Sequence, residues 1–131
     1  MENSTQLNLI SMSEINAEEV HWLWYPYIPL GKLTIIQGDP GEGKTSFILA
    51  VIAALTRGEP LPECAQAAKP MNVIYQTAED GLADTIKPRL ENAGADCTRV
   101  LVIDESKQEL TLCDARLEQA IRKTSAKLIV L

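Results

Sequence analysis

One short segment of the chain combines residue types that can bind an anion. Residues 38–45 read GDPGEGKT, so three glycines and a proline come directly before Lys44 and Thr45. Gly41 and Gly43 can adopt dihedrals that turn successive backbone N–H groups toward one point, and they carry no side chain that would keep a ligand away. The spacing matches G-x-x-x-x-G-K-[ST], the phosphate-binding P-loop. We therefore predict a nucleoside triphosphate site here.

The Lys-Thr pair has two different predicted tasks. Lys44 would reach the β- and γ-phosphates as a point charge and would be catalytic. Thr45 would offer its hydroxyl to Mg²⁺, a metal that is held by few protein ligands together with phosphate oxygens and water. A helix that begins at Lys44 would add free N–H groups and the positive end of its dipole. The predicted ATP-binding residues are Gly38, Asp39, Pro40, Gly41, Glu42, Gly43, Lys44, Thr45 and Ser46.

The alternative for this segment is a glycine-rich turn between a strand and a helix that binds nothing. The flanking strand and helix patterns favour phosphate binding, because a P-loop needs that context. Asp39, Pro40 and Glu42 fill the variable positions of the motif, and we expect no role for them beyond the shape of the loop.

A second candidate residue is Glu79, in the segment YQTAEDG. It follows a predicted strand, at the edge where open α/β sheets bind ligands. A carboxylate there could orient and deprotonate a water for attack on a γ-phosphate. The alternative is a solvated acidic turn, in which Asp80 or Asp84 caps the next helix. The spacing alone leaves both interpretations open.

The elements that must position these residues alternate along the chain. Short apolar runs predict four strands, at residues 32–37, 72–77, 99–104 and 126–131. Strands that alternate with helices are typical of a parallel sheet covered on both faces. Residues 21–29, with two tryptophans and two prolines, predict an extended segment that covers one edge of the sheet. The alternative is that Trp22, Trp24 or Tyr25 stacks near the nucleotide or a neighbouring subunit.

Three helices are predicted between these strands. Residues 44–57 form an apolar helix that ends at Arg57 and Gly58, a typical helix C-terminus. Residues 81–94 form a helix that starts late or kinks at Pro88, with one face made of Leu82, Ile86, Leu90 and Ala93. Residues 113–124 form an amphipathic helix with Leu117, Ala120 and Ile121 directed inward.

Composition and charge narrow the class of protein. The 131 residues are 46% hydrophobic and 23% charged, which is typical of a globular domain. The longest apolar stretch is too short to span a bilayer, and the first residues lack the pattern of a signal peptide, so we expect a cytoplasmic protein without membrane partners. The formal net charge of −6 gives no support for nucleic-acid binding by the surface as a whole. The three cysteines are scattered and there is one histidine, so we expect no Cys/His metal site.

The chain resembles the RecA-type P-loop ATPases, in particular the RepA/DnaB-like helicase ATPases of plasmids and phages. The segments that carry the resemblance are WLWYPYIPLGKLTII, GDPGEGKT, VIYQTAEDGLADTIKPRLENAGAD and AKLIVL. The resemblance implies a three-layer αβα domain with a mainly parallel sheet. Residues 1–29 would be a lead-in with an aromatic cover, and residues 30–131 part of the RecA-like domain. AKLIVL resembles the start of a Walker B strand, so we expect a domain truncated there, before the Walker B aspartate, the sensor and the arginine finger.

The resemblance also implies a function. The family hydrolyses ATP with Mg²⁺ in DNA replication, helicase or recombination work, with single-stranded DNA and a homo-oligomeric, hexameric ring as partners of the parent protein. Glu79 matches the glutamate that polarises the attacking water in this family. We expect this piece to bind ATP-Mg²⁺ but to hydrolyse it poorly. The alternatives are a non-enzymatic nucleotide-binding module and, with less support, a small-molecule P-loop kinase.

Overall fold

A three-stranded parallel sheet forms the centre of the computed structural model, which describes residues 5–64, 69–77, 81–105 and 108–131. Its strands are β3 (Val73–Tyr75), β4 (Val100–Leu101) and β5 (Leu128–Val130), in the order β4-β3-β5. In this register Val73 lies beside both Val100 and Leu128. Three of the predicted strands are therefore confirmed, each shorter than its apolar run.

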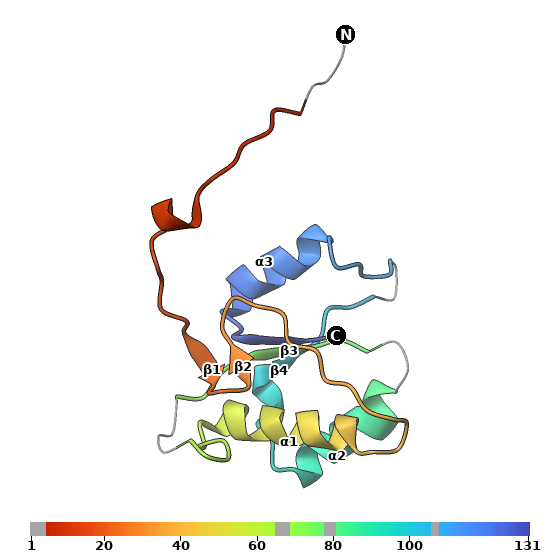
Figure 1. Ribbon diagram of the computed structural model, residues 1–131. Coiled ribbons are helices and arrows are strands. Elements are labelled where there is room, and N and C mark those ends of the chain that lie inside the picture. The colour runs from red at the N-terminus through yellow and green to blue at the C-terminus, as the bar shows by residue number, and fades with distance from the viewer. Residues whose placement is uncertain (1–4, 65–68, 78–80, 106–107) are drawn as a thin grey trace.

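Helices cover the sheet on two sides, as Figure 1 shows. Helices α1 (Lys44–Arg57) and α2 (Lys87–Asn92) lie on one side and α3 (Ala115–Thr124) lies on the other. Residues of β3, the middle strand, are accordingly buried on both faces, which a parallel sheet of β-branched residues requires. The predicted α/β class with a parallel sheet is confirmed.

The predicted strand at residues 32–37 is wrong. Residues 33–39 form neither helix nor strand and belong to no described sheet, and Leu33 and Ile35 are 84% and 69% exposed. An apolar, β-branched run favours a strand through its local preference for extended backbone. A strand also needs a hydrogen-bonded neighbour, which depends on distant parts of the chain.

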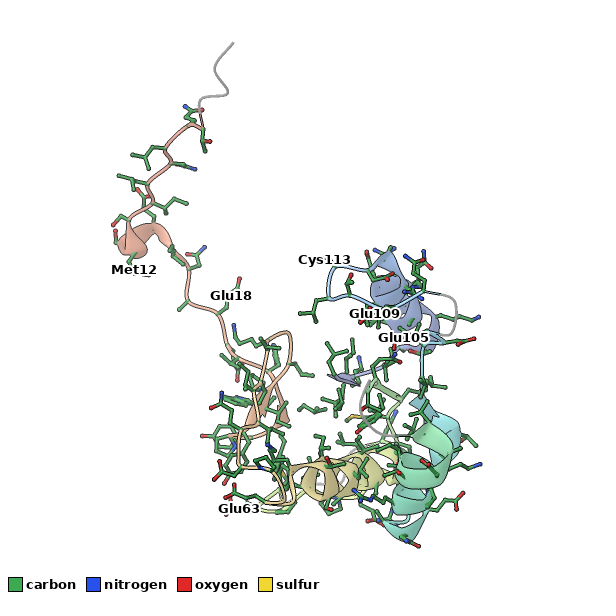
Figure 2. The ribbon with its side chains drawn as sticks, turned by 90° about the vertical axis from the view of Figure 1, so that its right-hand side faces the viewer. Met12, Glu18, Glu63, Glu105, Glu109 and Cys113 are labelled. Carbon is green, nitrogen blue, oxygen red and sulfur yellow. The ribbon has the colours of Figure 1, made fainter. Side chains whose placement is uncertain are left out.

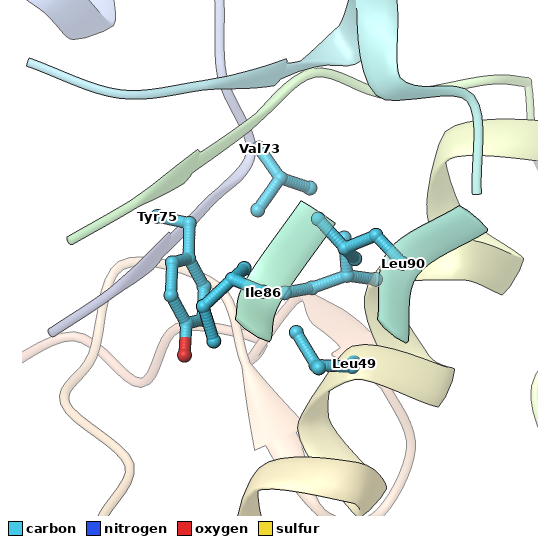
Figure 3. Close-up of a cluster of buried hydrophobic side chains, with 6 residues drawn as sticks. Leu49, Val73, Tyr75, Ile86 and Leu90 are labelled. Atoms are coloured by element: carbon cyan, nitrogen blue, oxygen red, sulfur yellow. The ribbon is translucent and has the colours of Figure 1, made fainter. Parts of the chain in front are cut away.

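A glycine flanks helix α1 at each end. Gly43 is the residue before its first turn, and Gly58 follows its last turn with φ of 70°, where its N–H reaches the carbonyls of Ala54 and Leu55. Buried residues of α1 join two hydrophobic clusters. One contains Leu49 and Ile52 with residues of β3 and α2 (Figure 3). The second contains Val51 and Leu55 with Trp24, Ile28 and Leu61.

The predicted helix over residues 81–94 changes type at its proline. One π-helical turn, η2 (Leu82–Ile86), leads into α2, and Pro88 lies in the first turn of α2. Proline has no N–H to donate and its ring crowds the preceding turn, so a regular α-helix through Pro88 is disfavoured. Ile86 and Leu90 are buried as predicted, but Leu82 is exposed.

The third helix, α3, begins one residue after its capping residue Asp114, whose carboxylate accepts the backbone N–H of Arg116. Leu117 is buried as predicted. Ile121, predicted to point inward, is instead 36% exposed, and Leu117 is the buried residue of this helix. A 3₁₀ turn, η3 (Cys97–Arg99), precedes β4.

The N-terminal part contains a hairpin rather than the extended segment predicted for residues 21–29. Strands β1 (Trp22–Trp24) and β2 (Ile28–Pro29) pair antiparallel. Pro26 lies in the connecting turn and Pro29 ends β2, which are positions that tolerate a missing ladder N–H. Before the hairpin, residues 5–20 extend away from the body and contain one short 3₁₀ turn, η1 (Met12–Glu14). Among the described helices none is long and apolar enough to cross a membrane.

Candidate nucleotide-binding site

The loop 38–43 has the backbone shape that the motif predicts. Gly41 and Gly43 both have φ of 85°, in the left-handed region, so any other residue there would be strained although there is open space for a side chain. The loop leads directly into α1, whose first internal hydrogen bond runs from the N–H of Phe47 to the carbonyl of Gly43. No side chain caps this end of α1. Its first N–H groups are therefore available to an anion from outside the helix.

Polar groups of the loop bind one another in this structure. The Glu42 carboxylate accepts the backbone N–H of Asp39, with Oε2 2.9 Å from the nitrogen. The Lys44 ammonium donates to the carbonyl of Gly38. A β-carbon on Gly38 would lie 2.8 Å from the Glu42 carboxylate, so a larger residue at position 38 would require this flexible side chain to move. This contact gives Glu42 a role that its variable position in the motif did not reveal.

The remaining predicted ligands lie on the first turn of α1 or in the loop. Thr45 is half-buried and Ser46 is exposed. Among the residues that the structure describes, no group of three His, Cys, Asp or Glu side chains could hold a metal ion. The threonine hydroxyl would then be one protein ligand beside phosphate oxygens and water, which suits Mg²⁺. These residues therefore fit a bound Mg²⁺-nucleotide.

Glu79, the predicted base, lies outside the described residues, together with Asp80. The strand before it is well defined at its carboxyl end. The N–H of Gln76, one residue after β3, donates to the carbonyl of Val130, 2.8 Å away, so β3 and β5 end at the same edge of the sheet. Gly38 to Ser46 lie together on the loop 38–43 and the first turn of α1.

Gln76 is a residue whose importance the sequence analysis missed. Its side chain is buried, and its amide continues the sheet beyond the backbone ladder: the N–H of Ile103 donates to Oε1 over 2.6 Å, and Nε2 donates to the carbonyl of Ile103 over 3.3 Å. The signal was a polar residue directly after the apolar run VIY. Gln76 thus holds the chain after β4 against the chain after β3, directly before the predicted base.

Comparison with known proteins agrees with the loop geometry. A family model for an AAA domain matches residues 5–131, which is nearly the whole chain. The chain belongs to this AAA-domain family. It is a family of AAA-type P-loop ATPases, for which ATP and Mg²⁺ are the typical ligands. No curated protein and no solved structure shows a significant match.

In this AAA domain the aromatic hairpin packs beside the start of α1. The ring of Trp24 stacks on Phe47, with centroids 5.9 Å apart, and its indole N–H donates to the carbonyl of Pro62 over 3.0 Å. Trp24 is buried, whereas Trp22 and Tyr25 are exposed. Since Phe47 is in the first turn of α1, the hairpin supports the helix start that follows the loop.

Proposed function

We propose that residues 38–46 of this AAA domain bind ATP with Mg²⁺ and that the protein acts as an ATPase. One observation carries the proposal: an exposed loop with two left-handed glycines leads directly into an uncapped helix start at Lys44. A convergent set of backbone N–H groups with one ammonium beside them is suited to the triphosphate tail of a nucleotide. Membership of the AAA-domain family supports the same proposal.

The proposal assigns separate roles to the loop, to the first residues of α1 and to Glu79. The N–H groups of the loop and of the first turn of α1 hold the phosphates, and Lys44 exchanges the Gly38 carbonyl for phosphate oxygens. Thr45 contributes the protein ligand of Mg²⁺, which would neutralise charge on the phosphates. Glu79 orients the attacking water. The catalytic contribution of the loop is electrostatic and positional, as phosphoryl transfer requires.

We further propose that the parent protein is a RecA-type ATPase of the RepA/DnaB-like kind, with a three-layer αβα domain, cytoplasmic, working as a ring on single-stranded DNA. The support is the series of motifs given above, especially TAED followed by a PRL helix. The formal charge of −6 makes the surface as a whole a poor partner for a phosphate backbone, so DNA contacts would require a local site.

The central experiment measures binding of a fluorescent ATP analogue in Mg²⁺ to the chain and to Lys44→Ala. We expect at least about ten-fold weaker binding, because a charge-assisted hydrogen bond contributes roughly 1.5–3 kcal/mol. Lys123→Ala on α3 is the matched control, since it removes an exposed lysine far along the chain from the loop. Equal affinity of Lys44→Ala and the parent chain would refute the proposed site.

Phosphate release from Mg²⁺-ATP, with and without single-stranded DNA, separates an ATPase from a module that only binds nucleotide. The same assay tests Glu79. In the parent protein, we expect Glu79→Gln to keep nucleotide binding and to lose about 10²-fold in turnover, the size of a general-base contribution. Glu91→Gln, an exposed change on α2, is its control. Turnover that survives in Glu79→Gln would show that another group is the base.

A further inference from the structure

A hollow opens between helices α1 and α2, beside the start of α1. It has a volume of about 420 Å³ and is lined by Ser46, Leu49, Arg89, Asn92 and Ala93. Figures 1 and 2 show the two helices next to each other from two directions. Because sites for small molecules have volumes of about 300–1,000 Å³, the hollow is large enough for the nucleoside part of a nucleotide.

The core of the domain holds the walls of this hollow in place. Leu49 of α1 packs with Ile86 and Leu90 in one buried cluster (Figure 3). Since Leu49 also lines the hollow, it supplies an apolar floor. Arg89 and Asn92 are three residues apart, so they lie on one face of α2, beside the buried Leu90.

The hollow begins where the proposed phosphate site ends. The first N–H that bonds within α1 belongs to Phe47 and reaches the carbonyl of Gly43, which leaves the N–H groups of Lys44, Thr45 and Ser46 for phosphate oxygens. Ser46 also lines the hollow. A nucleotide whose phosphates lie at these N–H groups therefore has the hollow next to it for its nucleoside.

The lining has the chemistry that recognises a purine base. A planar guanidinium stacks on aromatic rings, and Arg89 is exposed and takes part in no ion pair within the part of the chain that the structure describes. The side-chain amide of Asn92 has both a donor and an acceptor, the pair of groups that matches N7 and the N6 amino group of adenine. Leu49 and Ala93 add apolar surface for the ring.

We propose that the hollow holds the adenosine of bound ATP, with adenine stacked on the Arg89 guanidinium and its edge hydrogen-bonded to the Asn92 amide. This inference rests on the proposed function, because the loop 38–43 must hold the phosphates. It adds base specificity to that function. All nucleoside triphosphates share the phosphates that the loop binds, so the loop alone does not select ATP, whereas Arg89 and Asn92 contact the part that differs.

Isothermal titration calorimetry of the full chain with Mg²⁺-ATP and with Mg²⁺-tripolyphosphate, a ligand that lacks the nucleoside, tests the role of Arg89. We expect Arg89→Ala to weaken ATP binding at least ten-fold and tripolyphosphate binding less than two-fold. Arg89→Lys keeps the charge but loses the planar group, so it should also weaken ATP binding several-fold. Arg122→Ala on α3, whose side chain is 79% exposed, is the matched control and should change neither affinity.

Base selection is tested with Mg²⁺-ATP and Mg²⁺-GTP. The parent chain should prefer ATP, and Asn92→Ala should reduce that preference at least five-fold, because the amide that matches adenine is lost. Glu91→Gln, at the neighbouring exposed position of α2, should leave the preference unchanged. Unchanged thermal melting of the variants would verify that the fold is intact.

Two results would overturn the base site and leave the phosphate site standing. The first is an equal loss of ATP and tripolyphosphate affinity in Arg89→Ala, which would place Arg89 on the phosphates. The second is unchanged ATP binding in both Arg89→Ala and Asn92→Ala. In each case tripolyphosphate binding that is lost in Lys44→Ala would still support the loop. A chain that binds neither ATP nor tripolyphosphate would refute the proposed function and this inference together.

Discussion

Internal hydrogen bonds link single residues of the loop 38–43 and the adjoining Lys44. The Glu42 carboxylate accepts a hydrogen bond from the backbone N–H of Asp39, and the Gly38 carbonyl accepts one from the Lys44 ammonium. Both donors belong to groups that we propose for phosphate binding. A nucleotide would therefore exchange these internal contacts for contacts of its own, and Glu42 places a negative charge beside the proposed phosphate position.

We predict that Glu42→Gln tightens ATP binding about five-fold. Glutamine can still accept the Asp39 N–H, but it removes a like charge from the site, and an exposed charge contributes about 1 kcal/mol or less. Titration with a fluorescent ATP analogue at two salt concentrations measures the effect, which should shrink as salt increases. Glu59→Gln, at the other end of α1, should leave affinity unchanged. Weaker binding in Glu42→Gln would instead indicate that the carboxylate assists the ligand.

At the start of helix α3, the Arg116 side chain connects the preceding loop to the helix by hydrogen bonds. Arg116 binds both carboxylate oxygens of Asp114, and it also donates to the carbonyls of Gln108 and Glu109. Asp114 is at the same time the capping residue of α3. The Asp114 carboxylate accepts hydrogen bonds from the Arg116 side chain and from the Arg116 backbone N–H. These bonds stabilise its charged form and lower the pKa of Asp114 to about 2.

We predict that Asp114 stabilises the domain above about pH 4 and that this contribution disappears toward pH 2. The ordinary pKa of an unfolded aspartate is about 3.9, so the folded state favours the charged form and loses this preference as pH falls through the lowered pKa. Thermal melting of the parent chain and of Asp114→Asn should differ at pH 6 and converge near pH 2. The exposed pair of Glu118 with Arg122 supplies the control Glu118→Gln, with little effect expected at either pH. A difference that does not change with pH would contradict this role of the Asp114 charge.

At the scale of the whole molecule, α1 connects the two hydrophobic clusters. Leu49 and Ile52 pack with the sheet and α2, and Val51 and Leu55 pack with the hairpin β1–β2 and Leu61. The partly buried Ile48 and Leu128 contact both clusters. The position of the loop 38–43 relative to the sheet therefore depends on the packing of one helix.

We predict that Ile52→Ala lowers the free energy of unfolding by about 2–5 kcal/mol, because Ile52 is fully buried and its truncation leaves a cavity. Denaturant unfolding followed by circular dichroism and by tryptophan fluorescence measures this loss. Since α1 joins both clusters, the two signals should shift together. Ala50→Ser, on the exposed side of α1, is the control. Signals that separate in Ile52→Ala would show that the hairpin and the sheet unfold independently.

Features that depend on local chemistry could be predicted from the order of the amino acids. The loop 38–45 was readable because only glycine adopts the left-handed backbone at positions 41 and 43 without strain. The strands around Val73, Val100 and Leu128 and the three helices were readable from apolar spacing and capping residues. Each of these signals acts within a few residues of its own position.

The pairing of segments and the contacts of polar side chains became known from the folded chain. It left residues 32–37 without a sheet partner, turned residues 22–29 into a hairpin, and placed Gln76 against Ile103. These features join residues far apart in the chain, and their stability depends on burial and hydrogen bonding between distant segments, which a local pattern does not encode.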